Sequence, residues 1–110
     1  MKPISIVVAD DHPVVLHGVT DVLTSNSDMT VVSACGDGTT ALEAIRQLAP
    51  TIAVLDGRMP GLSGLDVVAS ISRERCPTKV VLLVATATDE QRLCSKGRPL
   101  PLARFVARGL

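Results

Sequence analysis

Two short apolar runs in this chain each end in carboxylates. The run Val7–Ala9 leads into Asp10 and Asp11, and the run Ile52–Leu55 leads into Asp56. Runs of this length and composition are typical of strands buried inside a parallel sheet. If the two strands are neighbours, the three carboxylates meet at one edge of the sheet, where open α/β folds place their sites. Because like charges repel, such a cluster requires a cation or screening by solvent.

The length and composition of the chain indicate one globular domain with an aliphatic core. Of its 110 residues, 46% are hydrophobic and 20% are charged, which argues against a disordered chain. Phe105 is the single aromatic residue, so the core is expected to consist of Val, Leu, Ile and Ala. Cys35, Cys76 and Cys94 are widely spaced without a CxxC pair, which disfavours a disulfide framework or a zinc site. Because no apolar run is long enough to span a bilayer, we expect a cytoplasmic protein that does not contact a membrane.

The apolar pattern predicts strands and helices in alternation. Pro13 is well placed as the first residue of a helix, and Thr39 or Thr40 is expected to cap the next one. The expected strands are 4–9, 29–35, 52–55 and 79–85, and the expected helices are 13–25, the segment after the Thr cap as far as Leu48, 65–75 and a short one at 89–96. This rhythm predicts an α/β fold with a doubly wound parallel sheet.

Charge is distributed unevenly, although the formal net charge is zero. All eleven acidic residues and six of the eleven basic residues precede Arg92. We therefore divide the chain into a core at 1–91 and an atypical basic tail at 92–110, in which 102–106 is a candidate fifth strand. The tail is interpreted either as an electrostatic arm for nucleic acid or an acidic partner, or as a poorly specified end produced by a shifted reading frame. We favour the second interpretation.

Three segments of the core carry a family resemblance: VVADDHPVVLHGV, LDGRMPGLSGLDVV and PTKVVLLVATATDEQ. Together they resemble the receiver domain of two-component response regulators, in the subfamily that usually carries a LuxR-type helix-turn-helix output domain. The specific combination is the acidic doublet followed by His-Pro, together with the later Asp-x-x-Met-Pro-Gly-x-x-Gly. The resemblance implies a flavodoxin-like fold with strand order 2-1-3-4-5.

The resemblance also implies the chemistry of the acidic cluster. Asp56 would be the phosphoacceptor, receiving a phosphoryl group from a phosphohistidine of a sensor histidine kinase. Asp11 would ligate Mg²⁺ directly and Asp10 would do so through water, with Asp56 and the backbone carbonyl of Arg58 as further ligands. Such a site fits the chemistry, since Mg²⁺ prefers oxygen ligands and phosphoryl transfer depends on positioning and charge neutralisation. The chain is then expected to act in signal transduction and transcription regulation as a phosphoacceptor rather than as an enzyme.

Plainer interpretations of the same residues remain open. Asp10 and Asp11 can serve as a turn and helix cap, and His12 is more simply a surface residue than a ligand. The main alternative function is a receiver-like interaction module that is not phosphorylated and acts through its helical faces. A small phosphohydrolase with Asp56 as nucleophile is disfavoured, because haloacid-dehalogenase-like enzymes need a second Asp where Arg58 stands.

The chain departs from the receiver pattern in its last third. The hydroxyl residue that receivers place at the end of the fourth strand falls on Val84, and Thr86 is the nearest candidate for this switch role. No Lys matches the one that follows the family's fifth strand, because Lys96 lies too early. We therefore expect a site that binds metal but switches poorly.

The end of the chain also bears on its partners. After a strand at 102–106, too few residues follow for the family's last helix, and losing that helix would uncover an apolar face of the sheet and favour a homodimer. No helix-turn-helix pattern follows Gln91. We therefore expect no direct DNA binding by this chain alone, since in the resembling subfamily the output domain performs that role.

Overall fold

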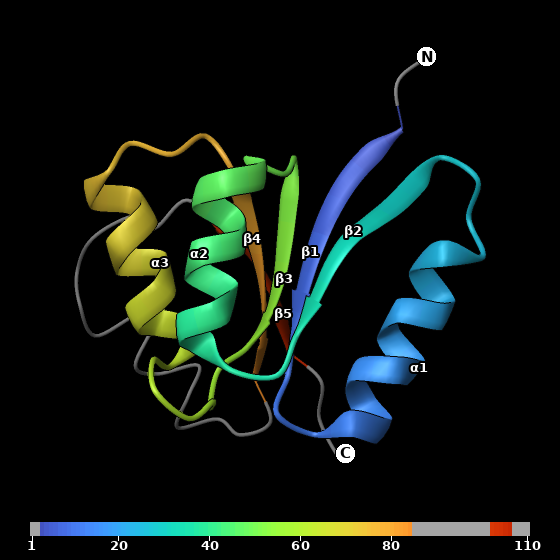
Figure 1. The fold of residues 1–110 in the computed structure, drawn as a ribbon, viewed down its shortest axis with the longest axis horizontal. Helices are drawn as coiled ribbons and strands as arrows, with labels where there is room; N and C mark the ends of the chain where they lie inside the picture. The colour runs from blue at the N-terminus through green and yellow to red at the C-terminus, as the bar shows by residue number, and fades with distance from the viewer. Residues whose placement is uncertain (1–2, 85–101, 107–110) are drawn as a thin grey trace.

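The computed structural model describes residues 3–84 and 102–106, which form a parallel sheet with helices on both faces (Figure 1). The elements are β1 (Ile4–Ala9), α1 (Pro13–Thr24), β2 (Met29–Cys35), α2 (Gly38–Leu48), β3 (Ile52–Asp56), α3 (Gly64–Arg73), β4 (Lys79–Val84) and β5 (Leu102–Val106). Within the described ranges the sheet has five strands in the order β2-β1-β3-β4-β5, all paired in parallel. The predicted fold class is confirmed, and β5 occupies the range of the candidate fifth strand.

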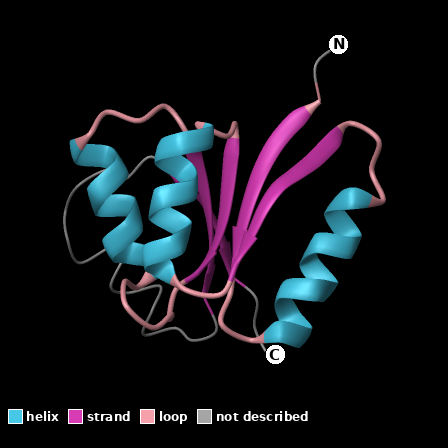
Figure 2. Ribbon diagram, in the orientation of Figure 1, coloured by secondary structure: helices cyan, strands magenta, loops and turns pink. Residues whose placement is uncertain are grey.

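The helices divide between the two faces of the sheet. Figure 2 shows α2 and α3 side by side on one face and α1 on the other. Successive side chains of β1 point to opposite faces of the sheet, as in any strand. Val7 and Ala9 belong to the core under α2 and α3, whereas Ile6 and Val8 face α1. The α2/α3 core is completed by buried Cys35, Ala41, Leu42, Ile45, Ala53, Leu55, Met59, Val67, Val68, Ile71, Val80 and Leu82.

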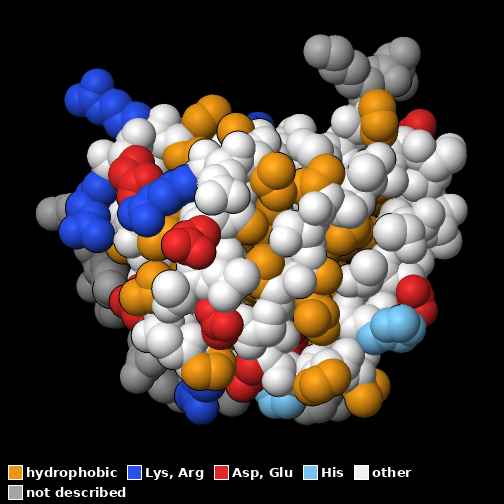
Figure 3. Space-filling view, viewed as in Figure 1, with side chains coloured by type: hydrophobic (Ala, Val, Ile, Leu, Met, Phe, Trp, Pro, Cys, Tyr) orange, Lys and Arg blue, Asp and Glu red, His pale blue; other side chains and the backbone are white. Residues whose placement is uncertain are grey.

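The α1 face is the less completely covered of the two. None of the twelve residues of α1 is fully buried, and Val81 and Leu83 of β4 are only partly buried on this side. Val14 and Val22 of α1 are 85% and 71% exposed. Figure 3 shows hydrophobic side chains at the surface in the middle of the molecule, between its α1 and α2 sides. The aliphatic core expected from the composition is therefore concentrated beneath α2 and α3.

Helix caps account for the differences between the predicted and observed starts of α2 and α3. Asp37, not Thr39 or Thr40, caps α2, because its extended backbone lets its side chain accept a hydrogen bond from the Thr40 N–H at 2.7 Å. The helix α3 begins at Gly64, one residue earlier than predicted, because Ser63 and Asp66 form a capping box.

The ranges of β1 and β2 match the prediction, β3 extends one residue further to Asp56, and a few other boundaries differ by one or two residues. The helix α1 ends at Thr24 rather than at residue 25, and α3 ends at Arg73 rather than at residue 75. The strand β4 is described as far as Val84, and residue 85, its predicted end, lies outside the described residues. The predicted short helix at 89–96 lies outside the described residues. No helix in the described part of the chain is both long and apolar enough to cross a membrane.

Gly64 brings the first turn of α3 into direct contact with the end of β3. A Cβ atom at this position would lie 2.5 Å from the carbonyl oxygen of Asp56 and 2.6 Å from Leu82 Cδ1. We expect Gly64→Ala to lower the free energy of unfolding by about 2 to 3 kcal/mol, because backbone must move to admit the methyl group. Urea denaturation followed by circular dichroism measures the change. Gly36→Ala is the matched control, since its Cβ would meet nothing within 4 Å; equal losses in the two variants would contradict the steric explanation.

Candidate functional site

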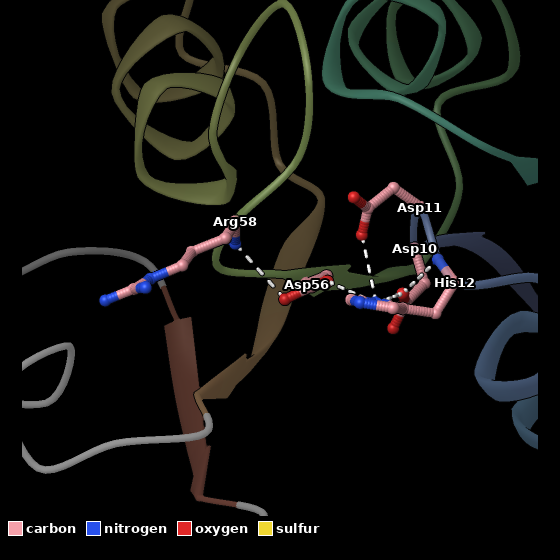
Figure 4. Close-up of polar contacts among 5 residues, drawn as sticks. All are labelled: Asp10, Asp11, His12, Asp56 and Arg58. Atoms are coloured by element: carbon pink, nitrogen blue, oxygen red, sulfur yellow. Dashed lines mark hydrogen bonds and ion pairs between the residues drawn. The ribbon is translucent and has the colours of Figure 1, made fainter.

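The carboxyl ends of β1 and β3 lie next to each other. Ala9 pairs with Leu55 in the parallel register, so Asp10 and Asp56, the residues after this pair, lie at the same edge of the sheet. Figure 4 shows their side chains together with that of Asp11. One potential ligand atom from each of these three residues and from His12 lies within 4.8 Å of all the others. The structure thus brings together the three carboxylates that the sequence placed at one edge.

His12 lies between the three carboxylates. Its Nδ1 atom is 2.9 Å from Asp10 Oδ1, 3.0 Å from Asp11 Oδ1 and 3.7 Å from Asp56 Oδ2. The hydrogen bond to Asp10 and then the negative charges of Asp11 and Asp10 raise the pKa of His12 above its ordinary value. The side chain is 68% exposed, in agreement with the predicted surface position. We did not predict from the sequence that His12 lies among the carboxylates. The available signal was its position directly after Asp10 and Asp11.

Asp10 and Asp56 are held by the backbone around them. The Asp10 N–H donates to the Cys35 carbonyl at 3.1 Å, which ties the first carboxylate to the end of β2. Asp10 is buried, with 4% of its surface exposed. Asp56 Oδ1 accepts a hydrogen bond from the Arg58 N–H at 3.1 Å. The Asp10 carboxylate also accepts a hydrogen bond from the His12 N–H at 2.8 Å, so both carboxylates are held by backbone groups at the ends of neighbouring strands.

Burial is the main influence on the ionisation of Asp56. It raises the pKa of this carboxyl group to about 6, and the charges of Asp10 and Asp11 act in the same direction. The hydrogen bond from the Arg58 N–H opposes the shift, because it stabilises the ionised form. At neutral pH Asp56 is largely ionised, as a nucleophile must be, but its charge is energetically unfavourable until a cation is close.

Arg58 contributes to the site through its backbone. Its N–H contacts Asp56, whereas its guanidinium group points away from the three carboxylates (Figure 4). The loop that begins at Gly57 is joined to the sheet by a hydrogen bond from the Gly57 N–H to the Leu83 carbonyl, at 3.0 Å. The backbone of this loop, rather than a cationic side chain, therefore approaches the phosphoacceptor candidate.

The other candidate residues can be placed only in part. Val84 is the last residue of β4 and follows Leu83, which pairs with Asp56, so the residue expected to carry a hydroxyl group lies at the same sheet edge as the carboxylates. Thr86 and Lys96 lie outside the described residues. Arg104 belongs to β5 and pairs in register with Leu82.

The metal-free protein is expected to become more stable as the pH falls from about 8 to about 6. The stabilising contacts of protonated His12 are fully present below its ordinary pKa of 6.5 and are lost as the pH rises through its raised pKa. Ionisation of Asp56 destabilises the fold progressively from its ordinary pKa of 3.8 up to about 6, and this penalty is complete above that value. Thermal denaturation in the presence of a chelator measures the trend.

Between these two pH values the slope comes mainly from His12, because the penalty for ionised Asp56 is already complete above about pH 6, so removing the imidazole should flatten the curve. The double variant His12→Ala, Asp56→Asn is the control, and its melting temperature should depend less on pH between these two values. A metal-free wild-type protein that is more stable at the higher pH would contradict the electrostatic description of the cluster.

Comparisons with known proteins agree with this geometry. The family model for the response regulator receiver domain matches residues 6–97. A Mycobacterium tuberculosis protein named "Probable transcriptional regulatory protein NarL" is 40% identical over 107 residues, which cover 97% of this chain and 49% of that protein. The nitrate/nitrite response regulator protein NarP of Escherichia coli is 30% identical over 84 residues, covering 76% of this chain and 39% of NarP. The chain thus spans about half or less of the length of these relatives.

Solved structures show the same relationship. The signal receiver domain of NarL from Mycobacterium tuberculosis superposes with a TM-score of 0.85 at 31% sequence identity, covering 96% of this chain and 84% of that one. The family named from the sequence motifs is therefore confirmed by sequence and by structure. The chain belongs to the response regulator receiver domain family of two-component signalling proteins.

Proposed function

We propose that this chain is a phosphoacceptor in which Asp56 receives a phosphoryl group from the phosphohistidine of a sensor histidine kinase, with Mg²⁺ bound by the acidic cluster. Receiver domains bind Mg²⁺ at an acidic site and interact with histidine kinases. The observation that carries the proposal is the partly buried carboxylate of Asp56 at the end of β3, with a ligand atom of Asp10 and of Asp11 within 4.8 Å. Cytoplasmic localisation is part of the same proposal.

The donor set fits Mg²⁺. Three carboxylates supply the oxygen ligands that this ion prefers, and the exposed side of the cluster leaves room for the waters that it retains. Asp11 and Asp56 would bind it directly, Asp10 through water, and the Arg58 carbonyl would add a further ligand. When bound, Mg²⁺ supplies positive charge that reduces the repulsion among the carboxylates and between Asp56 and an incoming phosphoryl group. His12 would have to give up its position between the carboxylates.

The proposed reaction is a displacement at phosphorus. An oxygen of ionised Asp56 forms a new O–P bond while the N–P bond of the donor phosphohistidine breaks, and the electron pair of that bond returns to the donor imidazole, which takes up a proton. The Arg58 N–H orients the carboxylate through its bond to Oδ1. The product is an aspartyl phosphate whose phosphate group carries roughly −1.5 to −2 of charge, in place of the single negative charge of the Asp56 carboxylate.

Phosphorylation by a small donor tests the proposal. Wild-type protein incubated with acetyl phosphate and Mg²⁺ should gain the mass of one phosphoryl group, as measured by intact-protein mass spectrometry. The gain should disappear when a chelator replaces Mg²⁺. No gain in mass with Mg²⁺, or an equal gain with the chelator, would contradict the proposal.

A second candidate function is a receiver-like interaction module that does not use phosphorylation. Val84, at the end of β4, favours it, because a valine offers no hydroxyl group to a phosphoryl group on Asp56. This alternative predicts that partner binding is the same in wild type and in Asp56→Asn. Relatives of this chain are named as transcriptional regulators, and for both candidate functions we place any DNA binding outside residues 1–110.

A further inference from the structure

We infer that Gly38, at the start of α2, is a positioning residue for the metal site. The β3–α3 loop, residues 57–63, follows the phosphoacceptor candidate directly, and Gly38 allows α2 to hold the middle of this loop. The consequence for Mg²⁺ rests on the proposed function, whereas the contact itself is a feature of the fold.

The β3–α3 loop is fixed at its ends and in its middle by different elements. At its ends, Gly57 donates its N–H to the Leu83 carbonyl at 3.0 Å, and the Gly64 N–H donates to the Gly57 carbonyl at 3.2 Å. In its middle, the Pro60 carbonyl accepts a hydrogen bond from the Gly38 N–H at 3.3 Å. The sheet and α3 therefore hold the ends of the loop, and the first residue of α2 contacts its centre.

Gly38 fits against the loop because it has no side chain. Gly38 is buried, and a Cβ atom would lie 1.8 Å from the carbonyl oxygen of Leu62, 2.6 Å from its carbonyl carbon and 2.9 Å from its Cβ. The first two of these atoms are backbone, so rotation of a side chain cannot relieve the overlap. Any larger residue at Gly38 must push the loop and α2 apart.

Displacement of the loop reaches the site through Arg58. Arg58 lies in this loop, its N–H is 3.1 Å from Asp56 Oδ1, and its carbonyl is a proposed Mg²⁺ ligand. Asp56 belongs to β3 and Asp10 follows β1, so both remain tied to the sheet when the loop moves. Gly38 therefore affects how tightly the ion is held more than it affects the nucleophile.

The test compares Gly38→Ala with Gly36→Ala, whose Cβ would meet nothing within 4 Å. Isothermal titration calorimetry should show the Mg²⁺ dissociation constant of Gly38→Ala raised by about tenfold, as for other residues that support metal ligands. The phosphorylation rate at saturating Mg²⁺ should recover toward the wild-type value, because the backbone of Asp56 and Asp10 is still held by the sheet. Gly36→Ala should match wild type in both measurements. Unchanged affinity in folded Gly38→Ala, or equal losses in both variants, would overturn the inference.

Two further measurements test the inference even if the protein does not bind Mg²⁺ or if Gly38→Ala does not fold. In metal-free protein, the backbone amide resonance of Arg58 should shift in Gly38→Ala and not in Gly36→Ala; an unshifted resonance would overturn the inference. A wild-type protein without Mg²⁺ affinity would instead overturn the proposed function. If Gly38→Ala does not fold, Gly61→Ala disturbs a neighbouring contact between the same loop and α2, since Gly61 has φ +79° and its Cβ would lie 2.7 Å from Thr39 Oγ1. It should weaken Mg²⁺ binding, and Gly61→Asn should retain more affinity because Asn adopts positive φ more readily; wild-type affinity in Gly61→Ala would overturn the inference.

Discussion

Replacing Asp56 with asparagine is expected to abolish phosphoryl transfer to this chain while making the metal-free protein more stable. An amide is not a nucleophile toward phosphorus, and the Asp10 and Asp11 carboxylates occupy other positions in the cluster. The gain in stability follows from removing a charge that is unfavourable in its surroundings, since burial and neighbouring carboxylates raise the pKa of Asp56 from 3.8 to about 6. After allowance for solvent around this partly exposed group, the gain near neutral pH is about 1 to 2 kcal/mol.

Two measurements on Asp56→Asn check the predicted loss of phosphoryl transfer and the predicted gain in stability. Intact mass spectrometry after incubation with acetyl phosphate and Mg²⁺ should show no added phosphoryl group, and urea denaturation in a chelator should show a higher midpoint than wild type. Asp28→Asn, which removes an exposed carboxylate far along the sequence from the cluster, is the matched control and should behave as wild type. Undiminished labelling of Asp56→Asn would show that another residue accepts the phosphoryl group.

Replacing Asp11 with asparagine is expected to weaken Mg²⁺ binding by about 100-fold, the second large effect. The substitution removes one of the negative charges whose oxygens lie within 4.8 Å of one another, and Mg²⁺ binds a neutral amide oxygen much less strongly than a carboxylate. Asp11 is a better position for this test than the buried Asp10, because a third of its side chain is exposed and its replacement leaves the core intact.

Isothermal titration calorimetry of Mg²⁺ into wild type, Asp11→Asn and Asp28→Asn measures the effect. Phosphorylation of Asp11→Asn at a fixed low Mg²⁺ concentration should fall with the affinity and recover in part when the ion is in excess. If Asp11→Asn binds Mg²⁺ as tightly as wild type, the ion does not sit among these carboxylates.

The sheet was predictable because its strands are short and mostly apolar, with many β-branched residues. The bounds of β1 and β2 match the predicted ranges, and the meeting of Asp10 with Asp56 follows from the rule that parallel strands end at one edge. The caps were harder to predict, since Asp37, Thr39 and Thr40 are all residue types that cap helices and only the backbone conformation at Asp37 distinguishes them.

The details of the site depend on contacts that sequence patterns do not encode. The placement of His12 Nδ1 among three carboxylates requires a particular side-chain direction, which spacing alone does not give. The approach of Gly38 to Leu62 joins two segments separated by β3, so neither local sequence contains it. In contrast, the position of Val84 follows from counting along β4, and the structure places it directly after the residue that pairs with Asp56.

The uneven coverage of the sheet bears on assembly. Val81 and Leu83 are only partly buried on the α1 face, and from the sequence we expected one apolar face of the sheet, without specifying which, to be uncovered. The homodimer expected from the sequence stays a prediction, which size-exclusion chromatography with light scattering would test.

Locating the phosphoryl group within the chain is the most direct test of a phosphoacceptor site at the ends of β1 and β3. Protein phosphorylated with acetyl phosphate and Mg²⁺ can be treated with borohydride, which reduces an aspartyl phosphate to homoserine, and then digested and sequenced by mass spectrometry. We predict homoserine at position 56 and at no other position, and none when a chelator replaces Mg²⁺. Modification at a residue other than Asp56, or a phosphoryl group on His12, would contradict the assignment.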